Sequence, residues 1–196
     1  KSEKKEESLT EAIDVLRKWD FTVSKESVAM SLAHYYANNY IRNGKAPEGL
    51  IFLEQFSYFG SKSPVKERLT IFEEAISELE KDFGTWKTVW GEINRYQRLN
   101  GDIQQAFNDK MPSIPVGLAS GRWGALASFG ARKYEGTNRI YGSSGNSFVA
   151  VVEFGEKVKA KSMLAGGQSG DPNSPHFDDQ AQRYADIKFK DVAFYR

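Results

Sequence analysis

Apolar residues recur at helical spacing through the first half of the chain. Ser8 and Glu11 have the spacing of a capping box, in which each side chain satisfies a free amide at a helix start. We therefore expect a frayed tip at residues 1–8 and a first helix from Ser8 to about Asp20. Its apolar face stands at positions i, i+3, i+4 and i+7: Leu9, Ala12, Ile13 and Leu16.

Three further helices follow from the same periodicity. Ser24 is a favourable N-cap for a second helix that ends near Gly44, and residues 48–59 form an apolar and aromatic third segment. Ser63 as N-cap, with Pro64 at the first helical position, introduces the fourth helix, which ends at Gly84. Its predicted apolar seam is Val65, Leu69, Phe72, Ile76, Leu79 and Phe83.

The pattern changes from helical to extended after about residue 111. Residues 147–154 are rich in β-branched and aromatic types, and residues 157–164 alternate polar with apolar. Gly155 and Glu156 between them fit a two-residue hairpin turn, so we expect an antiparallel pair. Its inward residues are expected to be Val158, Ala160, Ser162 and Leu164, with Lys157, Lys159 and Lys161 outward. The alternating tail, residues 187–195, predicts a last strand.

These elements predict an α+β fold, with a mainly helical part at residues 1–110 and a part at residues 111–196 made of loops, a hairpin and a C-terminal strand. No linker or repeat divides the chain, so residues 1–196 are predicted to be a single domain or a fragment of one.

Lys and Arg number 27 against 26 for Asp and Glu, which argues against nucleic acid as a partner. No apolar run is long enough to span a bilayer, and the absence of cysteine leaves the compartment open.

Polar side chains are densest between Met163 and Gln180, after the predicted hairpin. Gly166 and Gly167 allow the backbone to turn there where a side chain would clash, and a short helix is expected over residues 178–184. The candidates for chemistry in this loop are Gln168, Ser169, Asp171, Asn173, Ser174, His176, Asp178 and Asp179.

Neither a metal site nor a catalytic triad fits the spacing of these residues. His176 with Asp178 and Asp179 supplies too few ligands for a closed site, and the other histidine, His34, has no carboxylate or second histidine at helical spacing. Ser169 lacks the glycine spacing of a nucleophile elbow, and a serine triad drawn within one loop rarely reaches the required geometry. The sequence therefore predicts no catalytic, metal or cofactor-binding residue here. Asp171 and Ser174 are expected to cap turns, and His176 and Asp179 to hydrogen-bond within the fold.

Three motifs resemble segments of the penicillin acylase family, in particular its branch of aculeacin and acyl-homoserine lactone acylases. The loop Gly167-Gln-Ser-Gly-Asp-Pro-Asn-Ser-Pro-His-Phe-Asp-Asp-Gln180 resembles the family's Gly-Gln-Ser…Ser-Pro-His-Tyr…Asp-Gln block. Trp90-Gly-Glu-Ile-Asn-Arg95 resembles Trp-Gly-Glu-Val-His-Arg, with Asn94 where histidine is usual. Gly145-Asn-Ser-Phe-Val-Ala-Val-Val-Glu-Phe154 resembles Gly-Asp-Ser-Tyr-Val-x-Val-Val-Glu-Phe.

The resemblance implies an N-terminal-nucleophile hydrolase with an αββα sandwich, which hydrolyses amides between an acyl group and an amine. In such enzymes the first residue of the β chain, a serine in a Ser-Asn-x-Trp start, attacks the carbonyl. This chain opens Lys1-Ser-Glu-Lys4 and resembles the C-terminal part of a β chain, so no catalytic residue carries over. The implied partners are the α chain and the rest of the β chain, and the implied location is the periplasm or outside the cell.

The leading hypothesis is thus a C-terminal segment of a penicillin-acylase-like amidohydrolase, inactive alone, whose parent acts on β-lactams, N-acyl-homoserine lactones or lipopeptides. Such a segment is expected to expose an apolar surface where missing strands pack. Replacing His176 by alanine is expected to lower stability in the parent and not to abolish turnover. The alternative is a non-enzymatic binding module that contacts a partner through exposed Trp86, Trp90 and Tyr96.

Overall fold

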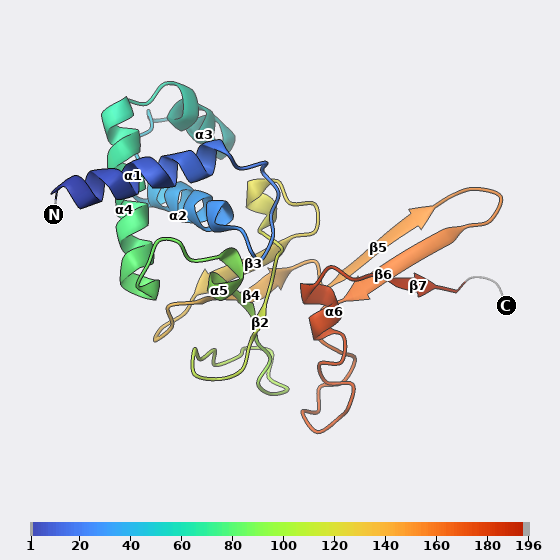
Figure 1. Cartoon of the computed structure of the whole chain (residues 1–196). Coiled ribbons are helices and arrows are strands. Elements are labelled where there is room, and N and C mark those ends of the chain that lie inside the picture. Colours follow the sequence, from blue (N-terminus) through green and yellow to red (C-terminus); the bar gives the residue numbers. More distant parts are fainter. Residues whose placement is uncertain (1, 194–196) are drawn as a thin grey trace. The chain divides into compact units, whose positions relative to one another are not determined.

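A computed structural model describes residues 2–193, with side chains from residue 6 onward. The chain forms two compact units (Figure 1). The first holds the residues up to Thr22 and Val28–Val89, and the second holds Val23–Ser27 and the chain from Trp90 on. The prediction of a single domain stays a prediction, and each unit is described by itself below.

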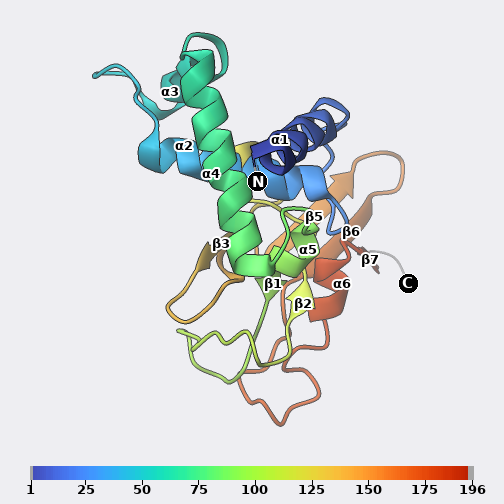
Figure 2. The ribbon, with the colours of Figure 1, turned by 60° about the vertical axis from the view of Figure 1, so that its left-hand side comes forward.

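The first unit is a group of four helices around an aromatic core. Helix α2 packs on α4, and Figure 2 shows the two crossing. The ring of Tyr40 stacks on that of Phe59 at 3.5 Å between centroids, and Tyr36 meets Phe59 and Phe72 edge-on. Glu78 of α4 accepts from Asn39 and Arg42 of α2 at 2.9 and 2.6 Å. The helices are α1 (Ser2–Arg17), α2 (Val28–Asn43), α3 (Phe52–Ser61) and α4 (Val65–Phe83).

Three predicted helix starts are wrong. The third segment was predicted from Glu48, and α3 begins at Phe52. Helix α1 begins at Ser2 and not at Ser8, because the Lys and Glu residues of the predicted frayed tip are themselves good helix formers. Helix α2 begins at Val28 and not at Ser24. The carbonyls of Lys25 and Ser27 accept hydrogen bonds from the amides of Gly91 and Trp90, at 2.7 and 3.1 Å, which holds the segment before Val28 out of the helix.

The fourth helix has the predicted length but a different seam. Gly84 ends it in the left-handed conformation with a φ of 80°, as predicted. Ser63 does not cap it, since its hydroxyl donates to the carbonyl of Phe59 at 2.7 Å. Val65 and Leu69 of the predicted seam are exposed, because burial along α4 is confined to the turns between Ile71 and Leu79.

The second unit contains two small sheets. One has the strand order β2-β1-β4-β3 and the other β5-β6-β7, and every pairing except β1 with β4 is antiparallel. The α+β fold class is confirmed. The elements are α5 (Trp90–Ile93), β1 (Asn94–Tyr96), β2 (Ile114–Pro115), η1 (Gly121–Trp123), β3 (Phe129–Lys133), β4 (Ile140–Gly145), β5 (Phe148–Glu153), β6 (Lys159–Leu164), α6 (Ala181–Ala185) and β7 (Lys190–Val192).

The predicted hairpin forms, but its turn is longer than predicted. Glu153 pairs with Lys159, so residues 154–158 form the loop (Figure 1). A two-residue turn would shift the register by one residue and place Val152 opposite Lys159. The observed register instead sets Val152 opposite Ala160. It places Glu153 and Lys159 opposite each other on the other face of the hairpin. Ala160 and Ser162 are buried and Lys159 and Lys161 are exposed, as predicted.

The last strand was predicted over residues 187–195. Residues 194 and 195 lie outside the described part of the chain.

An ion pair ties the segment Val23–Ser27 to the end of α6 within the second unit. The ammonium of Lys25 lies 2.9 Å from Oδ1 of Asp186, whose other oxygen lies 3.2 Å from Lys188. These ammonium groups, Lys25 first, hold the pKa of Asp186 at about 2. The side chain of Asp186 is 16% exposed, and that of Lys25 39%.

This pair predicts a specific loss of stability in acid. A folded-state pKa below the unfolded value of about 3.9 means that the contribution of Asp186 is fully present above about pH 4 and is lost as the pH falls toward 2. We expect Asp186→Asn to lower the free energy of unfolding at pH 7, with a difference from the unsubstituted chain that shrinks between pH 4 and 2. Urea denaturation across this range measures it, with Asp191→Asn at an exposed site as the control; a pH-independent difference would contradict the prediction.

Candidate functional site

The polar loop, residues 165–180, joins β6 to α6 and closes on itself through backbone hydrogen bonds. The amide of Gln180 donates to the carbonyl of Gly166 at 2.8 Å, and that of Ser169 to the carbonyl of His176 at 3.0 Å. Gly166 has a φ of 76°, and a side chain on Gly167 would collide with the backbone at His176 and Phe177. The predicted need for two glycines at this turn is therefore confirmed.

The short polar side chains of the loop form hydrogen bonds within the loop itself. Oδ1 of Asp171 accepts from the amide of Asn173 at 2.9 Å and from its side-chain nitrogen at 3.1 Å. The hydroxyl of Ser174 accepts from the amide of His176 at 3.2 Å. Asp171 and Ser174 hold turns, as predicted.

Ser169 and His176 do not form a catalytic pair. The hydroxyl of Ser169 accepts from the amide of Asp171 at 3.1 Å. Nδ1 of His176 lies 3.1 Å from Oδ2 of Asp179, so both side chains hydrogen-bond within the fold as predicted, although to each other, and this contact lowers the pKa of Asp179. Because the His176 side chain is 70% exposed, this pair is expected to add little stability.

The remaining candidates are not assembled into a metal centre. Gln168 and Asp178 are exposed. Among the residues from 2 to 193, no group of three or more histidine and carboxylate side chains is placed to hold a metal ion. His34, in the first unit, packs edge-on to Tyr35 with 6.0 Å between ring centroids.

Sequence reasoning missed Arg98, which holds the loop from outside. Nη2 of Arg98 donates to the carbonyl of Ser169 at 2.9 Å, and Nη1 donates to the carbonyl of Phe177. The guanidinium also lies over the buried ring of Phe177, 4.1 Å from its centroid. A separation of 71 and 79 residues between these partners leaves no local pattern that would reveal the contact.

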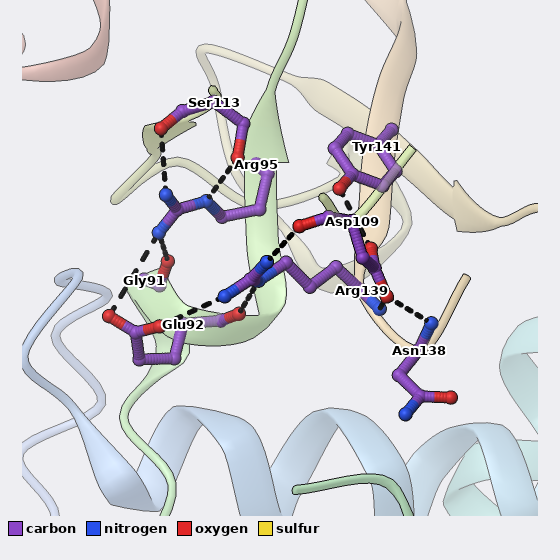
Figure 3. A network of polar contacts seen from close by, with 8 residues as sticks. All are labelled: Gly91, Glu92, Arg95, Asp109, Ser113, Asn138, Arg139 and Tyr141. Atoms are coloured by element: carbon purple, nitrogen blue, oxygen red, sulfur yellow. Dashed lines mark hydrogen bonds and ion pairs between the residues drawn. The ribbon is translucent and has the colours of Figure 1, made fainter. Parts of the chain in front are cut away.

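The motif Trp90–Arg95 spans α5 and β1 and is fixed by a second arginine (Figure 3). The side chain of Arg95 is 11% exposed. Its Nη1 donates to the carbonyl of Gly91 at 2.8 Å, and its Nη2 and Nε donate to the carbonyl and hydroxyl of Ser113 at 2.7 and 3.0 Å. Arg95 thereby ties the start of β1 to the segment that leads into β2.

A third arginine extends the same network to β4 (Figure 3). Nη1 of Arg139 donates to the carbonyl of Asp109 at 2.9 Å, and Nε donates to that of Glu92 at 3.2 Å. The carboxylate of Asp109 accepts from the hydroxyl of Tyr141 at 2.8 Å and from the amide of Asn138 at 2.7 Å. Burial first, and then Asp109, raises the pKa of Tyr141 to about 12, so this phenol stays protonated.

Asn94 occupies the fully buried centre of the motif. Its Nδ2 donates to two backbone carbonyls, those of Val116 and Leu118, both at 2.9 Å. The indole nitrogen of Trp90 donates to the carbonyl of Leu118 at 3.1 Å. The motif therefore secures the segment between β2 and η1.

A comparison with protein-family models decides the family. The model described as penicillin amidase matches residues 2–196. The chain belongs to the penicillin amidase family. No curated protein matches the sequence. The specific aculeacin and acyl-homoserine lactone branch stays a prediction.

All three motifs that carry the family resemblance lie in the second unit of this penicillin amidase chain. They form α5 with β1, the end of β4 with β5, and the polar loop. In the first and the last, the polar side chains mainly bind backbone groups. Family membership indicates an amide hydrolase, and these motifs contribute the internal bracing of its fold.

The aromatic residues on which the alternative hypothesis relied are not exposed. Trp86 is 4% and Trp90 is 2% accessible, and Tyr96 is partly buried against the core of the second unit. The expectation of a partner surface built from these rings is therefore wrong. Burial follows because both indoles and Tyr96 pack into cores that the local spacing of the residues does not reveal.

No helix in residues 2–193 has the length and apolar character to cross a bilayer.

Proposed function

We propose that this chain is the C-terminal segment of an acyl-amide hydrolase and that it lacks the nucleophile. The observation that carries the proposal is the family match over residues 2–196. We propose that the parent's substrates are of the β-lactam, N-acyl-homoserine lactone or lipopeptide type. The nucleophilic serine, its base and the oxyanion donors come from the rest of the parent. The role of this chain is to complete and stiffen the fold that holds them.

The two faces of the β5-β6-β7 sheet support a partner of this kind. One face carries ion pairs, Glu153 with Lys159 at 3.9 Å and Lys161 with Asp191 at 3.8 Å. The other face exposes two apolar side chains of β5, Phe148 at 61% and Val152 at 43%, and Phe154 at the start of the hairpin loop is 84% exposed. Apolar side chains that are exposed on a sheet face are covered in a complete fold. We propose that the remainder of the parent, exported to the periplasm, covers this face.

The absence of catalysis in the isolated chain is the first test. We expect the 196-residue chain to hydrolyse a chromogenic acyl amide no faster than its Ser2→Ala variant, and neither to exceed buffer, because the proposal places the nucleophilic serine in the rest of the parent. The precursor expressed from the whole gene is the positive control and should hydrolyse the same amide.

Two results would contradict the proposal. One is turnover by the isolated chain that survives Ser2→Ala. The other is a gene in which no self-cleavage site followed by Ser-Asn-x-Trp precedes the codon for Lys1.

Binding of an apolar dye by the chain tests the exposed sheet face separately. We expect the binding to be lost in the variant Phe154→Ser and to be unaffected by Lys157→Ser.

A further inference from the structure

A cleft of about 850 Å³ lies in the second unit, beside β3 and β4. The segment from Asp102 to Phe107 forms one wall, and β3 contributes Arg132 and, just beyond its end, Tyr134. Its charged lining consists of Arg98 and Arg132 against the single carboxylate of Asp102. The cleft therefore carries an excess of one positive charge and favours an anionic ligand.

Arg132 differs from the other arginines that surround this region. Arg95, Arg98 and Arg139 each donate to backbone carbonyls. The guanidinium of Arg132 is exposed, and its contact among the described residues is with the ring of Tyr134, 4.8 Å from the centroid. A guanidinium held flat on a ring keeps its edge open for two parallel hydrogen bonds to a carboxylate.

Aromatic rings continue the wall beside Arg132. The ring of Phe107 lies 4.6 Å from that of Tyr134 and stacks on that of Tyr141 at 5.0 Å with an interplanar angle of 8°. Ile103, on the same wall, is fully exposed. These groups offer an apolar surface to a flat or short apolar body that extends from the bound carboxylate.

A β-bulge on β4 shapes the floor of the cleft. Gly130 pairs with Ser144 and Ala131 with Gly142, so Ser143 is an extra residue on β4. Such a bulge redirects a side chain, and Ser143 lines the cleft with a hydroxyl that can donate to an anion. Gly142 also lines the cleft, and a side chain there would collide with the ring of Phe129.

We propose that this cleft binds a monocarboxylate that carries a flat or short apolar body. Arg132 receives the carboxylate, Ser143 donates a further hydrogen bond, and Phe107, Tyr134 and Ile103 contact the apolar part. The proposal is independent of the catalytic role of the parent, because it rests on the geometry of the second unit alone.

Benzoate, titrated into the 196-residue chain and followed by chemical shifts of backbone amides, tests the site. We expect saturable shifts at Arg132, Ser143 and Ile103. Benzamide, which keeps the ring without the charge, and acetate, which keeps the charge without the ring, should each bind about tenfold more weakly.

The variants separate binding from folding. Arg132→Gln should weaken benzoate about tenfold, and Arg183→Gln, which removes the same charge at an exposed site outside the cleft, should leave the affinity unchanged. Ile103→Ser should weaken benzoate but not acetate. Equal affinity for benzoate and benzamide, unchanged affinity in a folded Arg132→Gln chain, or no saturable shift at these residues would overturn the proposal.

Discussion

The substitution Asn94→Asp is expected to destabilise the second unit more than any other single polar change. The side chain of Asn94 is fully buried and donates two hydrogen bonds of 2.9 Å, to the carbonyls of Val116 and Leu118. A carboxylate at this position loses both donors and sets a charge against two carbonyl oxygens without water. We expect a loss of about 4 kcal/mol in the free energy of unfolding, and a fall of about 10 °C in melting temperature.

Two further variants isolate the cause of this loss. Asn94→Ala removes the same hydrogen bonds without burying a charge and should cost about 2 kcal/mol. Gln104→Glu adds one negative charge at an exposed position of the same unit and should change stability by less than about 0.5 kcal/mol. Thermal and urea denaturation measure all three. An Asn94→Asp chain that is as stable as Gln104→Glu would show that Asn94 does not brace the fold.

Replacing Arg98 by alanine is expected to release the polar loop and to cost about 3 kcal/mol. The change removes hydrogen bonds to the carbonyls of Ser169 and Phe177 and uncovers the ring of Phe177, which is 6% exposed. Arg98→Lys keeps the charge without the planar fork and should recover about half of the loss. Denaturation measures the stability, and hydrogen exchange at residues 168–178 reports whether the loop opens first.

The control for Arg98→Ala is a substitution in the solvent-exposed part of the same loop. His176→Ala breaks the hydrogen bond to Asp179 at the surface and should lower the melting temperature much less than Arg98→Ala does. Arg183→Ala, at an exposed position of α6, should change stability by less than about 0.5 kcal/mol. If His176→Ala and Arg98→Ala were equally destabilising, the exposed face of the loop, and not the guanidinium, would hold it.

The helices of the first unit were predictable in number and approximate place because their signals are local. Gly84 stops α4 where the sequence predicts, since a left-handed turn favours glycine. The errors arise where a distant segment competes with a local preference. Ser24 has the chemistry of an N-cap, but the hydrogen bonds that Lys25 and Ser27 accept from Gly91 and Trp90 delay the start of α2 to Val28.

The loop at residues 165–180 was predictable in its turns but not in its anchor. Gly166, Gly167, Asp171 and Ser174 act within a few residues of their own positions, so the spacing predicts what they do. Arg98 reaches the loop from another part of the chain, and no spacing in the sequence encodes that contact.

By itself, the sequence determined the family, the α+β class, an antiparallel hairpin of residues 147–154 with 157–164, though not its turn length or register, and the turns of the polar loop. Motifs, periodicity and turn chemistry act over short separations. Only the tertiary structure decided which side chains are buried and which arginines donate hydrogen bonds to backbone carbonyls. It placed Trp86 and Trp90 inside, bound Arg95, Arg98 and Arg139 to carbonyls, and left Arg132 over a ring at the edge of a cleft. These outcomes depend on which distant backbone groups lie within reach of a long side chain, and only the folded chain sets those distances.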